Sequence, residues 1–207
     1  MEHPAVMQRA LPVLLGIALL LGGCGGGGEM SMTEYGERID AAATEASQRA
    51  EELFADGVWS ADVTPRQLQA LLERGLREIR IPLQEAVDGI DPPAQITDLH
   101  DLMWDWHSEF IAVEEALAAR VGETEHSGEG WTALSESPEV AAYRSAIAEG
   151  KQICDGFQAR LDATAERGAF ADTPWIPSEM KEVIEAALGC QWFPEDPEGV
   201  YRYPPAS

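Results

Sequence analysis

The sequence has few basic residues, few cysteines and few histidines, and each shortage excludes a class of function. Its 207 residues carry 14 Lys and Arg against 37 Asp and Glu, which gives a formal charge of -23. Phosphate backbones repel a chain this acidic, so nucleic-acid binding is excluded. Three cysteines and four histidines leave little material for a metal cluster. Hydrophobic residues make up 45% of the chain, which is enough for a folded domain with a core.

Motifs for catalysis are also missing. The chain has no GxSxG turn, glycine-rich phosphate loop or HExxH zinc motif, and no CxxCH for covalent haem. A Glu-x-x-His motif occurs once, at Glu123–His126 in a glycine- and serine-rich stretch. A di-iron bundle needs two such motifs on different helices. We therefore expect that the protein is not an enzyme.

An uncharged apolar run, ALPVLLGIALLLGG, occupies residues 10–23. It is shorter than the roughly 20 residues of a membrane-spanning helix and is typical of the apolar core of a signal peptide. The sequence does not decide between Met1 and Met7 as the start. The run ends in Leu21-Gly22-Gly23-Cys24, which resembles the lipobox of bacterial lipoproteins. The resemblance implies cleavage before Cys24 and a diacylglyceryl group on its sulfur; the alternative is an uncleaved anchor.

This N-terminus divides the chain into four parts. Residues 1–23 are predicted to be the signal peptide, and residues 24–32 the lipidated cysteine with a flexible glycine-rich tether. Residues 33–190 are predicted to form a helical domain, followed by a Pro- and aromatic-rich tail at 191–207. The lipobox implies that lipid anchors the protein in the cell membrane or the outer membrane, on the extracytoplasmic side.

The domain shows helical periodicity and no sustained polar–apolar alternation. The spacing of apolar residues predicts four long helices and a short fifth, at about 33–56, 64–91, 93–121, 137–167 and 178–189, with a loop over 122–135. Thr64 and Pro65 begin the second helix as cap and first residue, and Pro82 should kink it. Short connections favour an all-α, antiparallel up-down bundle.

The two cysteines beyond the lipobox are predicted to pair. Cys154 lies on the inward stripe of the fourth helix, and Cys190 follows the fifth. An even pair in an exported protein favours a disulfide, which here would close a loop of about 36 residues and stabilise the fold by roughly 3–4 kcal/mol. A redox or metal pair is the alternative, although no CxxC motif is present.

The same region resembles small helical envelope lipoproteins of unknown function, a similarity that implies no activity. The residues that carry it are Pro92-Pro93, Leu99-His100, Ile153-Cys154, Phe157, Leu161 and Leu188-Gly189-Cys190.

The densest group of candidate binding residues lies on the third helix. His100, Trp104, His107 and Glu114 fall on one flank of a helical wheel. They could bind a transition metal if another helix added a carboxylate, or a b-type haem with Met103 or another methionine as second ligand. His100 and His107 are two turns apart, about 10.5 Å, so they cannot both reach one ion in an undistorted helix. The more ordinary interpretation places both histidines at the core boundary, packed on tryptophan.

The tail has two interpretations. Its aromatic residues stand among prolines and could dock on a partner, or the tail could pack back over the bundle, which we favour because exposed aromatics are costly in water. These residues are Trp192, Phe193, Tyr201 and Tyr203.

Taken together, the sequence favours a non-enzymatic, membrane-anchored binding or scaffolding module without a cofactor. Its partner would be an unknown envelope protein or a small ligand. The alternatives are a metal- or haem-binding bundle that uses the third-helix histidines, and a small-molecule-binding bundle whose pocket is lined by Trp104, Trp106, Trp131 and the aromatic tail.

Overall fold

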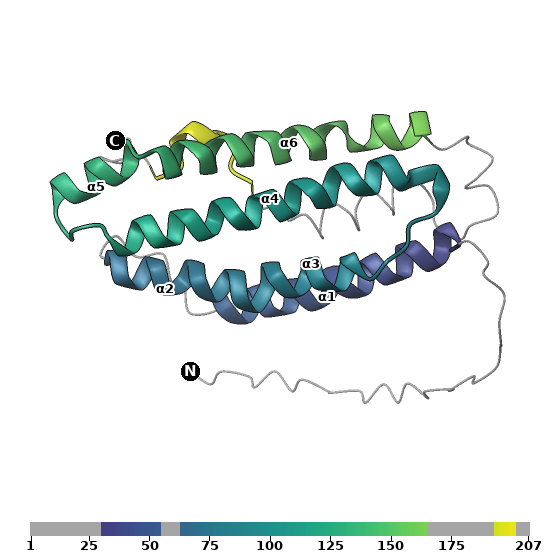
Figure 1. Ribbon diagram of the computed structural model, residues 1–207, viewed down its shortest axis with the longest axis horizontal. Helices are drawn as coiled ribbons and strands as arrows, with labels where there is room; N and C mark the ends of the chain where they lie inside the picture. Colours follow the sequence, from purple (N-terminus) through teal and green to yellow (C-terminus); the bar gives the residue numbers. More distant parts are fainter. Residues whose placement is uncertain (1–29, 55–62, 165–192, 202–207) are drawn as a thin grey trace, which may run out of the picture.

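The computed structural model describes residues 30–54, 63–164 and 193–201, and within these ranges it contains helices and no strand (Figure 1). The predicted all-α class is therefore confirmed. The signal peptide, Cys24, residues 25–29 of the predicted tether, the predicted fifth helix and Cys190 lie outside the described residues. Helix α1 begins at Met32, the last residue of the predicted tether. Of the helices described, none is long and apolar enough to cross a membrane.

Three helices are long: α1 (Met32–Phe54), α4 (Thr97–Gly122) and α6 (Pro138–Thr164). Between α1 and α4 the chain forms α2 (Pro65–Gly75), the π-helical turn η1 (Leu76–Arg80), α3 (Ile81–Asp88) and the 3₁₀ turn η2 (Ala94–Ile96). In Figure 1, α4 runs back along α2 and α3, and α6 runs back along α4. Helix α4 is therefore central, because it packs against α6 on one side and α2 and α3 on the other.

Helix α2 begins where the sequence predicts. The Thr64 hydroxyl accepts a hydrogen bond from the Gln67 N–H at 3.3 Å, and the Gln67 side chain accepts one from the Thr64 N–H at 2.9 Å. Pro65 follows as the first helical residue, where its missing N–H is not needed. This reciprocal capping box fixes the start of the helix.

The predicted irregularity at Pro82 takes the form of a π turn directly before it. The N–H of Ile81 bonds to the carbonyl of Leu76, five residues back, rather than to the usual carbonyl four residues back. The predicted second helix is thus split into α2, η1 and α3. The turn positions Arg80, its last residue, against α4.

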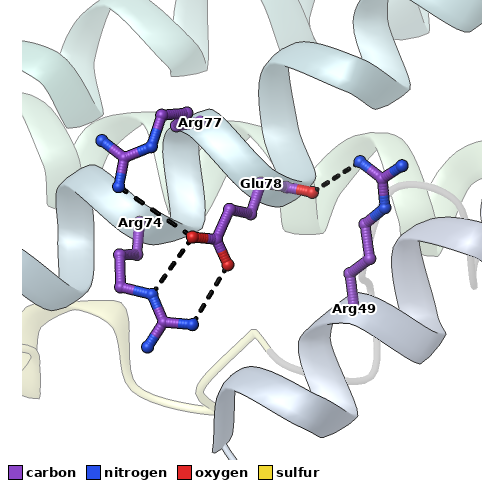
Figure 2. Close-up of polar contacts among 4 residues, drawn as sticks. All are labelled: Arg49, Arg74, Arg77 and Glu78. Carbon is purple, nitrogen blue, oxygen red and sulfur yellow. Dashed lines mark hydrogen bonds and ion pairs between the residues drawn. The ribbon is translucent and has the colours of Figure 1, made fainter.

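Pro82 also leaves the carbonyl of Glu78 without its usual helical donor, because proline has no N–H. Arg49 of α1 replaces the missing donor: its Nη1 donates a hydrogen bond to the Glu78 carbonyl at 3.0 Å (Figure 2). The Glu78 carboxylate lies on the surface, where hydrogen bonds from Arg74 at 3.1 and 3.2 Å lower its pKa. A side chain of α1 therefore ties that helix to the irregular turn.

The prediction of a loop over 122–135 is partly wrong. Residues Gly128–Ser135 form helix α5, which the Ser127 hydroxyl caps by accepting from the Gly130 N–H at 3.0 Å. Its two glycines have low helix propensity, so the sequence reads as a loop. The cap and the burial of Leu134 outweigh that propensity.

The C-terminal segment 193–201 packs back on the bundle and contains the short 3₁₀ turn η4 (Pro197–Gly199). In Figure 1 it lies along α6. Arg144 of α6 donates from Nε to the carbonyl of Val200 at 2.8 Å, and Phe193 and Val200 pack against the larger core cluster. Tyr201 has a φ of 53°, a left-handed conformation that is unusual for an aromatic residue, and its ring meets that of Tyr143 edge-on.

Candidate functional site

The four candidate residues on α4 all lie in the interior. Their exposed fractions are 8% for His100, 3% for Trp104, 0% for His107 and 7% for Glu114. The opposite side of the helix is buried too: Trp106 is 4% exposed, and its indole donates to the carbonyl of Ala146 of α6 at 3.0 Å. The structure therefore gathers the predicted flank into one buried polar row, which faces α1, η1 and α3.

His100 forms the first pair of this row with Tyr35 of α1. The phenol oxygen and the imidazole Nδ1 are 3.1 Å apart. Burial lowers the pKa of His100, with nearby aspartates opposing, and burial raises the pKa of Tyr35, with the Trp104 side chain opposing. The phenol therefore keeps its proton and donates it to a neutral imidazole, an assignment that follows from the bonding partners.

His107 forms the second pair with Gln84 of α3. Its Nδ1 lies 2.8 Å from Oε1 of Gln84. The amide nitrogen of Gln84 donates to Asp88 at 2.7 Å, and this fixes the amide oxygen toward the histidine. His107 must therefore donate from Nδ1, so its Nε2 carries a lone pair, for which the described residues supply no donor. Burial, reinforced by the positive charge of Arg80, lowers the pKa of His107 to about 3.

Glu114 forms the third pair with Arg80 of η1. The Nε of Arg80 lies 3.3 Å from the carboxylate, and its guanidinium carbon lies 5.0 Å from the centre of the Phe110 ring. Burial raises the pKa of Glu114, and Arg80 opposes this effect. Removal of the Arg80 charge would leave the buried Glu114 carboxylate without its partner, which is strongly destabilising.

These pairs do not gather the predicted ligands around one ion. His100 and His107 bond to Tyr35 and Gln84, and Glu114 bonds to Arg80. Within the described ranges, no group of three His, Cys, Asp or Glu side chains is placed to hold a metal ion. The arrangement matches the more ordinary interpretation, in which the histidines pack on tryptophan and bond to neighbours. Haem binding stays a prediction.

Sequence reasoning missed the partners of the row. Tyr35, Arg80 and Gln84 come from three other elements, and nothing in their local sequence marks them as polar core residues. The one available signal was Pro82, which lies between Arg80 and Gln84 and predicts an irregular helix there. The structure shows that irregularity as a π turn, a feature that often occurs at functional sites.

Of the three cysteines that carry predictions, the described residues include one. Cys154 is buried on α6, with 5% of its surface exposed. Its predicted partner Cys190, and the predicted lipidation site Cys24, lie outside the described residues. Both assignments stay predictions.

Comparisons with protein-family models, with curated proteins and with solved structures found no match to this chain.

Proposed function

We propose that the protein is an extracytoplasmic lipoprotein, anchored to a bacterial membrane through lipid on Cys24, whose helical body is a non-enzymatic binding or scaffolding module. The observation that carries the anchor is the motif Leu21-Gly22-Gly23-Cys24 after an apolar run, followed at once by four glycines. Helix α1 begins at Met32, so seven residues separate it from the cysteine. Seven extended residues reach about 25 Å at most, which would hold the body close to the membrane.

The buried polar row supports a non-enzymatic role. Its histidines and Glu114 are at most 8% exposed and bond to other side chains of the protein. A general acid, base or nucleophile must come within hydrogen-bond reach of a substrate. In this conformation the row serves instead to fix how α1, η1 and α3 sit on α4.

The acidic character of the chain indicates what kind of partner it would bind. A formal charge of -23 favours a partner with a basic surface and opposes direct contact with anionic lipid headgroups. Membrane attachment should then depend on the lipid alone. Binding to the partner should weaken as ionic strength rises.

The anchor is tested by fractionating cells that express the full chain and its Cys24→Ala variant. We expect the parent protein in the membrane fraction and the variant in the soluble fraction. A Gly26→Ala variant is the matched control, because it changes the tether close to the cysteine without touching the lipobox. Retention of Cys24→Ala on membranes would refute the anchor.

The binding role is tested by native mass spectrometry of residues 25–207, purified from the periplasm of a host without chelators, together with an absorption spectrum. We expect the mass of the polypeptide without a ligand, less the two hydrogens that the predicted disulfide removes. An added mass and absorption band of a metal or haem would favour the alternative, a carrier that uses the third-helix histidines. Crosslinking in the native envelope, at low and high salt, would then identify the basic partner.

A further inference from the structure

A continuous row of aromatic rings crosses the bundle from α1 through α4. Neighbouring ring centres in it lie 5.2–6.4 Å apart. In order, the rings are Tyr35, His100, Trp104, His107, Trp106 and Phe110. Tyrosine and tryptophan are the side chains of this row that a one-electron oxidant can oxidise. The oxidisable members of these six rings are therefore Tyr35, Trp104 and Trp106, and the two histidines lie between them. Beyond Phe110 the ring contacts continue to two further tyrosines, Tyr143 and Tyr201.

The three oxidisable rings differ in what can accept their proton. The Trp106 N–H bonds to a backbone carbonyl, which is not a base at neutral pH. The Trp104 side chain lowers the pKa of the Tyr35 hydroxyl, but its N–H has no base within hydrogen-bond distance among the described residues, although its ring adjoins both histidines. The Tyr35 hydroxyl alone meets a neutral imidazole nitrogen, at 3.1 Å.

This difference decides which of the three side chains would finally carry the radical. Oxidation makes a phenol or an indole N–H much more acidic. A tyrosine that loses an electron must also lose its proton, so a base within hydrogen-bond distance makes the oxidation easier. Oxidised Trp104 and Trp106 have no such base and stay radical cations, which can take an electron from a neighbour.

We propose that Tyr35 and His100 form a redox-active tyrosine–histidine pair, which is oxidised by electron transfer through Trp104 and Trp106. An external one-electron oxidant takes one electron from Trp106, and an electron then passes from Trp104 to Trp106. Tyr35 gives one electron to Trp104, its O–H bond breaks, and the proton moves to Nδ1 of His100. The products are the reduced oxidant, a neutral tyrosyl radical and an imidazolium, with both indoles restored.

From Trp106, one ring contact leads to the C-terminal segment. The Trp106 ring meets Phe193 edge-on at 5.7 Å, and Phe193 is partly exposed. An oxidant at this surface is thus separated from Trp106 by one ring. Tyr35 itself is 1% exposed, so an oxidant in solution cannot touch it.

The experiment oxidises the full chain with a photogenerated ruthenium(III) polypyridyl complex and follows radicals by electron paramagnetic resonance. We expect a tyrosyl signal that persists after the radicals of surface residues have decayed. In Tyr35→Phe this persistent signal should vanish and a tryptophan signal should remain. Tyr143→Phe is the matched control, since Tyr143 is also an inward-facing tyrosine and stacks on Phe110 in the same series of ring contacts, but no histidine of the described residues is its hydrogen-bond partner.

Two further measurements separate proton transfer from packing. In the unaltered protein, D₂O should slow formation of the tyrosyl signal, because the O–H bond breaks in that step. Trp104→Phe keeps a ring in place but removes the oxidisable bridge, so the persistent signal should fall although the Tyr35–His100 pair remains. Circular dichroism checks that each variant is folded. A persistent tyrosyl signal unchanged in Tyr35→Phe, or lost equally in Tyr143→Phe, would overturn the proposal, as would the absence of any persistent tyrosyl signal in the unaltered protein.

Discussion

Gly150 of α6 is the position at which the packing around α4 can be tested most directly. A Cβ at this buried residue would lie 2.3 Å from Cζ2 of Trp106. That ring cannot move aside freely, because its N–H bonds to Ala146 at 3.0 Å and its face stacks on Phe110 at 5.2 Å. Position 150 therefore requires glycine, because the indole leaves no room for a Cβ, even though glycine is a poor helix former.

We expect Gly150→Ala to lower the free energy of unfolding by about 2 kcal/mol. Alanine gains about 1 kcal/mol over glycine in a helix, but overpacking against a fixed ring costs about 3 kcal/mol, the upper end of its usual range. In a chain of this size the loss corresponds to a fall in the melting temperature of about 4–8 °C. Urea unfolding followed by circular dichroism measures the difference.

Gly75, at the end of α2, is the matched control. It has a helical φ of -56°, and a Cβ there would lie 4.0 Å from its nearest neighbour, Leu53. Gly75→Ala should raise stability by up to about 1 kcal/mol. In a Trp106→Leu background the penalty for Gly150→Ala should largely disappear. If both alanine variants raised stability alike, the argument from the indole contact would be refuted.

Three further outcomes follow from the interior contacts. The pKa of His107 in the folded protein, about 3, lies below its ordinary value of 6.5. The contribution of neutral His107 to stability is therefore complete above about pH 6.5 and is lost as the pH falls toward 3. Free energies of unfolding measured across that range should decline less in His107→Gln than in the unaltered protein. Arg49→Met should lower the free energy of unfolding by about 1 kcal/mol, because it removes the hydrogen bond to the Glu78 carbonyl. The loss should be smaller in a Pro82→Ala background, where the new helical N–H can bond to that carbonyl. Equal losses in a double-mutant cycle measured by urea unfolding would contradict this role of Arg49. Cys154→Ser should lower stability by roughly 3 kcal/mol if the predicted disulfide forms, and the intact body should weigh two hydrogens less than the reduced chain; equal masses before and after reduction would exclude the bond.

Local sequence signals predicted the helices well. The 3.6-residue period requires only that each helix bury one side, so it indicated the all-α class and four long helices. Three of these are continuous in the structure, and the one predicted over 64–91 is divided into α2, η1 and α3. Thr64 and Pro65 marked the start of α2 because capping is a contact within one turn. Where local signals conflict with packing they failed, as in α5, whose glycines suggest a loop.

The sequence by itself also placed the four polar residues of α4 on one flank, because the geometry of a single helix fixes that arrangement. It could not show what they contact. Tyr35 lies 65 residues from His100, and Gln84 lies 23 residues from His107, so only the packing of α1 and α3 on α4 brings these groups together. The π turn likewise decides that Arg80 meets Glu114. Hydrogen-bond partners and perturbed pKa values depend on burial and on contacts distant in sequence, and these exist only in the tertiary structure.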